Sequence, residues 1–362
     1  MMKTQPDPPT DPFRVLVVRT DRLGDVVLTL PLLPVIRQQY PQAQISMMVS
    51  RYAGAIAEGH PCLESLLWYD DDRGLIPFQK MVSILRAGKF DACIIVHPTP
   101  RLAFLMARSR IPVRVGSGYR WYSFLFNRRI YTHRKTAERH EVEYNLDLLR
   151  GLGMSIGEDI RPEFFISIPE DSRRRVGELL AEKGKTGRYV VVHPGSGGSA
   201  REWPRESLGA LTRQLMDAEG VEVFLTGTAA ERDQAEHLLG YTGGRAVNLS
   251  GQLNLKELAA LLERAALYIS NSTGPLHMAV AVGTPVLGFY PQIPVMGPRR
   301  WGPYTTTARV LVPRKPADCS QCRKRGTPCE CMASISINEA FSAACELLAV
   351  DRVPRVPSAY GS

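Results

Sequence analysis

The stretch that decides the fold is Ala266-Leu267-Tyr268-Ile269-Ser270-Asn271-Ser272-Thr273-Gly274-Pro275-Leu276-His277. The apolar run Leu267 to Ile269 predicts a short buried strand. The polar residues after it suit a helix N-cap, Pro275 suits the first helical turn, and Gly283 ends the predicted helix. Such a helix start presents free N–H groups and the positive end of the helix dipole, which favours an anion such as phosphate. The same pattern also fits an ordinary capped turn between a strand and a helix, so both interpretations stay open here.

Strands and helices alternate along the rest of the chain. Runs that are apolar on both faces, such as Val15 to Val18, Ala92 to Val96 and Tyr189 to His193, predict buried strands of parallel sheets covered by helices. A chain of 362 residues is too long for one typical core, so two domains are expected. We expect a disordered lead-in over 1–12, a Rossmann-like domain over 13–168, a second one over 169–335, and a final helix within 336–350 that packs back on the first domain.

Positive charge is concentrated in one segment. The formal net charge is +9, and the window from Arg101 to Arg139 alone contains ten basic residues and one acid, Glu138. Such a window favours an anionic partner, which is nucleic acid, phospholipid headgroups or a phosphorylated or carboxylated sugar, unless it is only a solvated face.

The overall composition is that of a soluble globular protein, with 44% apolar and 22% charged residues. No apolar run reaches the roughly 18 residues that cross a bilayer, and the first residues lack the apolar core of a signal peptide. We therefore expect a cytoplasmic protein.

Four of the seven cysteines form a cluster, Cys319, Cys322, Cys329 and Cys331. Because a cytosolic chain should hold no structural disulfide, the cluster indicates either a structural metal site or a reduced loop. Its Cys-x-Cys pair differs from the two Cys-x2-Cys pairs of a zinc ribbon.

Four candidate loops follow predicted strands, and ligands of open parallel sheets bind beyond the carboxyl ends of strands. These loops are Thr20 to Asp25, Pro194 to Trp203, Thr226 to Glu231, and Asn271 to His277. The first loop has a single glycine, Gly24, so it is not the Gly-x-Gly-x-x-Gly nucleotide fingerprint. We expect the binding site in a cleft between the two domains.

These loops resemble those of glycosyltransferase family 9, the heptosyltransferases of the lipopolysaccharide inner core, from about Val15 to Leu348. The landmarks that carry the resemblance are Gly24-Asp25, His193-Pro194-Gly195 with Arg201-x-Trp203-Pro204, Gly227-x-x-x-Glu231, and Ser270-Asn271-Ser272-Thr273-Gly274-x-x-His277. The resemblance implies the α/β fold called GT-B, with two Rossmann-like domains facing each other across a cleft. It also implies transfer from ADP-heptose with inversion and no cofactor.

Roles for single residues come from the same resemblance. Asp25 would be the catalytic base that takes the proton of an acceptor hydroxyl, although a carboxylate there also suits helix capping. The backbone N–H groups of Thr273 and Gly274 would stabilise charge on the leaving diphosphate. The remaining donor-binding residues would be Arg201 on phosphate, Glu231 on the ribose hydroxyls, Ser272, and His277 beside the same ligand.

Alternatives and departures remain at these donor positions. Glu231 also suits a first helical turn, and His277 also suits a packed core. Better-known members have lysine where this chain has Arg201, and often aspartate where it has Ser272. These differences leave the identity of the donor open, so another nucleotide-sugar or a protein acceptor is the alternative within the family.

The resemblance assigns the basic window to an anionic, lipid-linked saccharide acceptor. Candidate acceptor contacts are Arg114, Arg120, Arg128 and Arg129, while Trp121, Tyr122, Phe124 and Phe126 would either touch a membrane or fill the core. We expect a cytoplasmic enzyme with peripheral contact to the inner membrane and no nucleic acid. The rival from another class is a basic α/β protein that binds nucleic acid and has no transferase activity.

Overall fold

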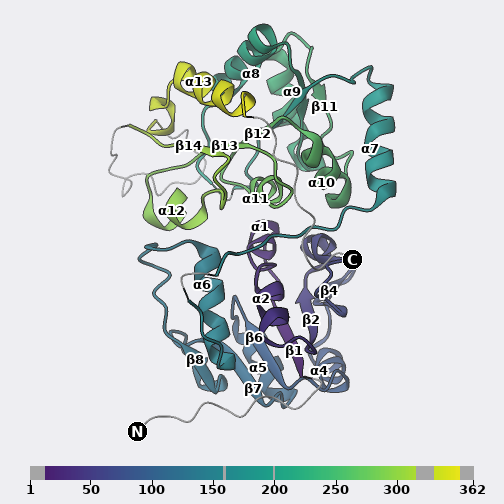
Figure 1. The fold of residues 1–362 in the computed structure, drawn as a ribbon, viewed down its shortest axis with the longest axis vertical. Coiled ribbons are helices and arrows are strands. Elements are labelled where there is room, and N and C mark those ends of the chain that lie inside the picture. Colours follow the sequence, from purple (N-terminus) through teal and green to yellow (C-terminus); the bar gives the residue numbers. More distant parts are fainter. Residues whose placement is uncertain (1–12, 158–159, 199, 315–329, 351–362) are drawn as a thin grey trace. The chain divides into compact units, whose positions relative to one another are not determined.

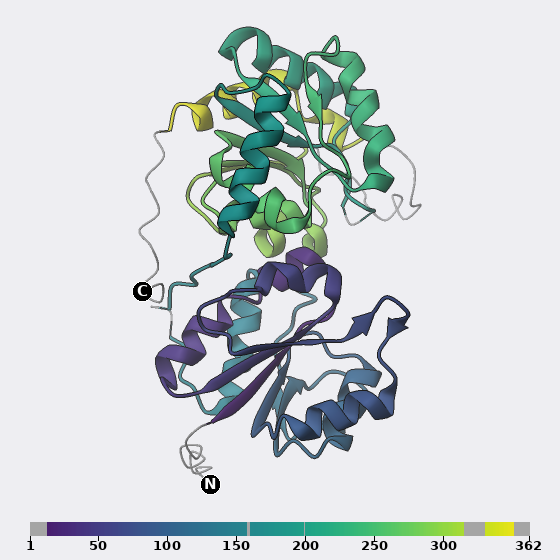
Figure 2. The same cartoon turned by 90° about the vertical axis from the view of Figure 1, so that its right-hand side faces the viewer.

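Each half of the chain builds one parallel six-stranded sheet with helices on both faces. The computed structural model describes residues 13–157, 160–198, 200–314 and 330–350. These residues divide into two compact units, the first made of 13–134 and 141–167, the second of Lys135–His140 and 168–350. Figures 1 and 2 show the sheet of each unit between its helices.

The sheet of the first unit has the order β3-β2-β1-β6-β7-β8, with all neighbours parallel. Its strands are β1 (Arg14–Val18), β2 (Gln44–Val49), β3 (Ser65–Trp68), β6 (Ala92–Ile95), β7 (Val113–Ser117) and β8 (Arg128–Ile130), and the small antiparallel pair is β4 (Asp70–Asp71) with β5 (Gly74–Leu75). Its helices are α1 (Leu23–Val27), α2 (Leu32–Gln39), α3 (Arg51–Gly54), α4 (Phe78–Ala87), α5 (Pro100–Arg108) and α6 (Glu141–Asp147), with 3-10 turns η1 (Ala55–Ala57), η2 (Ser123–Leu125) and η3 (Leu148–Leu152).

The sheet of the second unit repeats this arrangement in the order β11-β10-β9-β12-β13-β14. Its strands are β9 (Tyr189–His193), β10 (Glu222–Leu225), β11 (Val247–Asn248), β12 (Leu267–Asn271), β13 (Val286–Phe289) and β14 (Ala308–Leu311). Its helices are α7 (Glu170–Glu182), α8 (Arg205–Glu219), α9 (Arg232–Tyr241), α10 (Leu255–Arg264), α11 (Gly274–Ala281), α12 (Pro298–Trp301) and α13 (Ile337–Leu348), with 3-10 turns η4 (Ala229–Glu231), η5 (Pro294–Met296) and η7 (Met332–Ser334).

Prolines divide the helical segment after β1 into α1 and α2. Pro31 stands at the N-cap of α2, and Pro34 lies within the first turn of that helix. The first N–H groups of a helix have no partner inside it, so a proline at this place removes no hydrogen bond. The N-cap of α7 is Pro169. Asp171 lies inside the first turn, where its charge favours the positive end of the helix dipole.

The apolar face of α13 is part of the core of the second unit. Ala340, Ala344 and Leu347 are buried in one cluster with Leu211 of α8 and Phe289 of β13. This corrects the expectation that the last helix packs on the first unit. The spacing of alanine and leucine predicts an amphipathic helix, but it does not say which core the helix joins.

In both sheets, successive strands are first added on one side of the first strand and then on its other side. In the first unit this reversal lies between β1 and β6, and in the second between β9 and β12. The loops that leave these strands diverge, and ligands of open α/β sheets bind at such points, beyond the carboxyl ends of the strands. The candidate residues of each unit must therefore be sought at these two positions.

Candidate active site

Asp25 lies in a buried charged cluster at the carboxyl end of β1. Arg19, the residue after β1, is 3% exposed, and its guanidinium contacts two carboxylates from its own loop. Its Nε donates to Asp21 Oδ1 at 2.6 Å, and its Nη2 donates to Asp25 Oδ1. His97, which follows β6, has its Nδ1 at 2.9 Å from Asp21 Oδ2. The residues that follow β1 and β6, the two strands at which the sheet reverses, thus form this cluster.

A third carboxylate reaches the same guanidinium from α6. Glu141 is 1% exposed, and its Oε1 lies 3.7 Å from Arg19 Nη1 and accepts a hydrogen bond from Arg134 Nη1. Three carboxylates, of which Glu141 is buried and Asp21 and Asp25 are mostly buried, therefore surround one buried arginine. Burial disfavours the charged form of Arg19, but Asp25, Asp21 and Glu141 outweigh this effect and raise its pKa.

The two aspartates of this cluster have opposite pKa shifts. Burial raises the pKa of Asp25, with Asp21 and Glu141 adding to the effect and Arg19 opposing it. Burial alone would also raise the pKa of Asp21, but His97 and Arg19 outweigh it and hold the pKa at about 2. A carboxylate pair whose pKa values are pushed apart by their surroundings marks the group that exchanges a proton. Of the two, Asp25 has the raised pKa, and its side chain is 15% exposed, which agrees with the role predicted for it.

The sequence analysis quoted the loop of Asp25 but gave no role to Arg19, Asp21, His97 or Glu141. A buried strand that ends directly in an arginine is the signal that would have found Arg19, because a buried guanidinium needs carboxylate partners. Glu141 had no such signal, since 122 positions separate it from Arg19 in the sequence.

In the second unit, Glu231 lies at the carboxyl end of the neighbouring strands β9 and β10. Its Oε2 accepts hydrogen bonds from the N–H and the hydroxyl of Thr228, both at 2.9 Å, and its Oε1 lies 4.0 Å from His193 Nε2. Burial alone would raise the pKa of Glu231, but the Thr228 amide, His193 and the Gly197 backbone outweigh it and lower the pKa. Glu231 is therefore an ionised acceptor, suited to the hydroxyls of a sugar.

Two glycines leave room for this carboxylate. A Cβ on Gly195 would lie 2.3 Å from Glu231 Oε1, and one on Gly227 would lie 3.2 Å from Glu231 Cβ. The loop after β9 thus approaches Glu231 so closely that a side chain at position 195 would have to displace the Glu231 carboxylate.

The start of α11 is held against the loop after β9. Thr273 is its N-cap residue, but the Thr273 side chain accepts no capping hydrogen bond and lies 3.3 Å from the Ser270 hydroxyl. Asn271, expected as a cap, instead accepts from the Trp203 N–H at 2.8 Å. Because Pro275 has no N–H, the free donors at this helix start are the amides around Thr273 and Gly274.

That contact brings the loop of Arg201 and Trp203 to the edge at which α11 begins. Trp203 is 1% exposed and stacks on Phe289 with ring centroids 4.2 Å apart, so the end of this loop is fixed in the core. Arg201, two residues earlier, and Ser272, between Asn271 and Thr273, are both partly exposed at this edge. Both therefore lie where the sequence analysis expected the diphosphate.

The buried side-chain atoms that lack a hydrogen-bond partner lie near this edge. Within the described part of the second unit they are Gln234 Oε1, Ser250 Oγ, Tyr268 OH and His277 Nδ1. Burial, with His140 adding to it, lowers the pKa of His277 to about 3, so this imidazole is neutral. Since buried polar atoms in folded proteins nearly always have partners, these atoms favour a polar ligand here.

The four candidate arginines of the basic window have different surroundings. Arg114 is partly buried, and its Nε and Nη1 donate to the carbonyls of Leu125 and Ile111 at 2.8 and 2.6 Å. Arg120, which follows β7, is exposed, and so are Arg128 and Arg129, the first two residues of β8; Arg129 Nε donates to the Phe126 carbonyl. The aromatic residues divide as well, since Tyr122 and Phe126 are buried while Trp121 and Phe124 are exposed.

The cysteine cluster lies mostly outside the described residues, which include only Cys331 of the four. Among the described residues, no three His, Cys, Asp or Glu side chains are grouped to hold a metal ion. None of the helices within these residues is long and apolar enough for a bilayer crossing.

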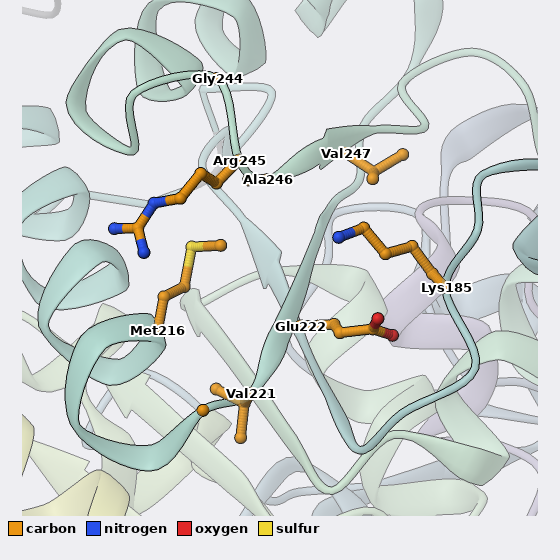
Figure 3. A pocket seen from close by; sticks show the side chains of 9 residues that line it. Lys185, Met216, Val221, Glu222, Gly244, Arg245, Ala246 and Val247 are labelled. Atoms are coloured by element: carbon orange, nitrogen blue, oxygen red, sulfur yellow. The ribbon is translucent and has the colours of Figure 1, made fainter.

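A separate concavity of about 510 Å³ lies at the opposite edge of the second sheet. Lys185, Glu222, Arg245 and Val247 are among its lining residues, and Figure 3 shows their side chains around it. Glu222 and Val247 begin β10 and β11, so this concavity is at the amino ends of the strands and is distinct from the site of Glu231.

Comparisons with known proteins show which proteins this chain is similar to. A Haemophilus influenzae protein that is named only as a glycosyltransferase is 29% identical to this chain over 298 residues, which cover 80% of this chain and 86% of that protein. Lipopolysaccharide heptosyltransferase 3 of Escherichia coli is 26% identical to this chain over 276 residues, which cover 74% of this chain and 80% of that protein. The solved structure of E. coli ADP-heptose lipopolysaccharide heptosyltransferase II matches with a TM-score of 0.76 at 19% identity, over 93% of this chain and 98% of that one.

The match to this structure shows the GT-B fold, which is built of two Rossmann-like units. The sequence model described as glycosyltransferase family 9 (heptosyltransferase) matches residues 78–333, and the chain belongs to this family. The expected family and fold class are thereby confirmed. Asp25 lies before the matched range, so its role stays a prediction that depends on the geometry described above.

Proposed function

We propose that this enzyme transfers heptose from ADP-heptose, with inversion, to an anionic, lipid-linked saccharide acceptor of the lipopolysaccharide inner core. The names of its relatives suggest this donor and acceptor class. The observation that carries the proposal is Asp25, a mostly buried carboxylate of raised pKa at the reversal of the first sheet. Such a group takes a proton from a hydroxyl more readily than an ordinary surface carboxylate.

The proposed reaction is a single displacement. Asp25 takes the proton of the acceptor hydroxyl while that oxygen forms a bond to C1 of the heptose. The bond between C1 and the diphosphate oxygen breaks, and ADP leaves with the electron pair. One base is sufficient because ADP is a good leaving group that needs little protonation, and no cofactor takes part in this step.

The donor half of the proposal uses the residues at the edge of the second sheet. The backbone N–H groups of Thr273 and Gly274, and the charge of Arg201, would stabilise the diphosphate as its negative charge grows. Glu231 would accept hydrogen bonds from the ribose through Oε1, because Oε2 is already bound by Thr228. Neutral His277 and Ser272 complete this set.

The acceptor half uses the exposed arginines of the first unit, Arg120, Arg128 and Arg129. Negative phosphates and carboxylates of a saccharide acceptor would complement them. Arg114 has two donors engaged with backbone carbonyls, so it would act through its remaining N–H groups. We propose that the enzyme works in the cytoplasm, at the periphery of the inner membrane where such an acceptor would lie.

A thermal-shift panel tests the donor. ADP-heptose should raise the melting temperature strongly, since a ligand at 100 times its Kd stabilises the native state by about 2.7 kcal/mol. ADP should raise it less, and UDP- and GDP-sugars should leave it unchanged. A shift with a UDP- or GDP-sugar alone would overturn the ADP-heptose assignment in favour of another family donor.

Gly195→Ala should weaken donor binding about tenfold or more. The new Cβ would meet Glu231 Oε1 at 2.3 Å and displace the carboxylate from its place beside the donor, which removes a charge-assisted hydrogen bond worth about 1.5–3 kcal/mol. Titration calorimetry with ADP-heptose measures the effect.

Gly240→Ala in α9 is the matched control, because a Cβ there meets no atom within 4 Å. It should leave donor affinity unchanged and raise stability slightly, since alanine favours a helix interior over glycine by roughly 0.5–1 kcal/mol. Equal donor affinity in both variants would mean that Glu231 does not hold the donor.

A further inference from the structure

Four aromatic side chains of the first unit are exposed beside its arginines. The exposed fractions are 47% for Tyr119, 71% for Trp121, 62% for Phe124 and 59% for Tyr131. Together with the exposed arginines they form what we call the aromatic–arginine patch: Tyr119, Arg120, Trp121, Phe124, Arg128, Arg129 and Tyr131. Large exposed aromatics that gather in this way mark an interaction surface.

The patch is built on a fixed part of the chain. Tyr122 and Phe126 are buried in the core, and the Tyr122 hydroxyl donates to the Pro98 carbonyl at 2.6 Å. The Ser123 hydroxyl donates to the Ser117 carbonyl and accepts from the Arg120 N–H. Trp121 and Phe124 are therefore exposed on a segment whose neighbouring residues Tyr122 and Phe126 are fixed in the core.

Contacts join the two loops that carry the patch. The Gly118 N–H donates to the Ile130 carbonyl at 3.0 Å, and the rings of Tyr119 and Tyr131 pack edge to face at 5.4 Å. Tyr119 OH also lies 2.7 Å from His133 Nε2. The loop after β7 and the residues after β8 thus form one surface at the edge of the sheet, where Figure 1 shows these two strands side by side.

The charged residues of the patch are all arginines, Arg120, Arg128 and Arg129. Residues 92–137 contain nine arginines and lysines and no aspartate or glutamate. Tryptophan and tyrosine prefer the headgroup level of a bilayer, and arginine is attracted to anionic lipids. A protein or nucleic acid partner explains the positive charge equally well, but an amphipathic aromatic rim beside arginines fits a bilayer interface best.

We propose that the aromatic–arginine patch docks the enzyme on a bilayer surface that contains anionic phospholipids, with Trp121 and Phe124 inserted among the headgroups. Tyr119 to Trp121 follow β7 and Tyr131 follows β8, two to three strands from the loop of Asp25 on the same edge of the sheet, which is roughly 10–14 Å. Phe124 lies on the connection between the two strands, and Arg128 and Arg129 lie within β8. Docking there presents a lipid-anchored saccharide to the base. The inference depends on the proposed function only for the lipid-linked nature of the acceptor.

Vesicle binding by the full chain tests the docking surface. The wild type should bind vesicles of phosphatidylcholine with phosphatidylglycerol, bind pure phosphatidylcholine far more weakly, and lose binding as salt rises. Trp121→Ser with Phe124→Ser should weaken binding at least tenfold, which is about 1.4 kcal/mol. Arg120→Gln with Arg128→Gln should remove most of the preference for anionic vesicles.

Leu75→Ser is the matched control, because Leu75 is 55% exposed on the β4–β5 hairpin of the same unit and outside the patch. It should bind vesicles like the wild type. Equal binding by the Trp121→Ser/Phe124→Ser variant and the wild type would overturn the proposal. Tight, salt-sensitive binding of RNA or duplex DNA with no vesicle binding would overturn it as well.

Turnover of a deacylated acceptor separates this proposal from the proposed function. The Trp121→Ser/Phe124→Ser variant should keep wild-type turnover of that soluble acceptor and lose turnover of the vesicle-bound one. A wild type that binds vesicles but transfers no heptose would refute the proposed function alone. A wild type that transfers heptose but ignores vesicles would refute the docking surface alone.

Discussion

Asp25→Asn should lose transfer by about 10³-fold or more while ADP-heptose still binds. Asparagine has nearly the shape of aspartate but cannot take the proton of the acceptor hydroxyl, and general base catalysis contributes about 10²–10⁴-fold to such steps. Steady-state turnover measures the loss, and thermal shift with ADP-heptose shows whether donor binding remains.

The same variant should be as stable as the wild type or more stable at pH 7. Burial raises the pKa of Asp25 above its ordinary value of 3.8, so the folded state holds this proton more tightly than the unfolded state does. The free energy of unfolding therefore falls as pH rises through the interval above 3.8. The ionised carboxylate costs stability at neutral pH, a cost that asparagine does not carry.

Asp21→Asn is the matched control and should have the opposite effect. Burial would raise the pKa of Asp21, but His97 and Arg19 outweigh it and hold it at about 2 against an ordinary 3.8. Its charge thus stabilises the fold by about 2 kcal/mol above pH 3.8, and this stabilisation is lost as pH falls toward 2. Asp21→Asn should lose that stability at pH 7 and keep more activity than Asp25→Asn. Equal turnover in Asp25→Asn and the wild type would refute the assignment of the base.

Local sequence patterns were sufficient to predict the central strands of both sheets and the positions of the loops that follow them, but not β7 and β8. The apolar runs at Val15 to Val18 and Tyr189 to His193 are buried strands at the centre of their sheets. A run that is apolar on both faces has no other stable place in a protein of this size, so its pattern determines the fold class. The loops at their carboxyl ends then follow from the direction of the chain.

Partners distant in the sequence could not be predicted in the same way. Trp121, Tyr122, Phe124 and Phe126 have similar side chains, and only the core of the first unit determines that Tyr122 and Phe126 are buried. Asparagine is a residue type that often caps helices, yet the Asn271 side chain accepts a hydrogen bond from the Trp203 N–H. Such outcomes depend on tertiary contacts, which local periodicity does not contain.

Arg19→Met should destabilise the first unit by about 3–5 kcal/mol, because it leaves buried Glu141 and mostly buried Asp21 and Asp25 without their common cation. Arg19→Lys should cost less, since it keeps the charge but cannot bind Asp21, Asp25 and Glu141 with one planar group. Chemical denaturation at pH 7 measures both. Arg245→Met is the control, because both side chains of its ion pair with Asp217 are about half exposed and such pairs are worth about 0–1 kcal/mol.

The pH profile separates a positioning role of Arg19 from a purely structural one. The positive charge of Arg19 opposes the raised pKa of Asp25, so its removal should raise that pKa further. Because the base must be ionised, the acidic limb of kcat/KM should move to higher pH in Arg19→Met and by a smaller amount in Arg19→Lys. If both variants melt early while the acidic limb stays in place, Arg19 serves the fold alone and does not tune the base.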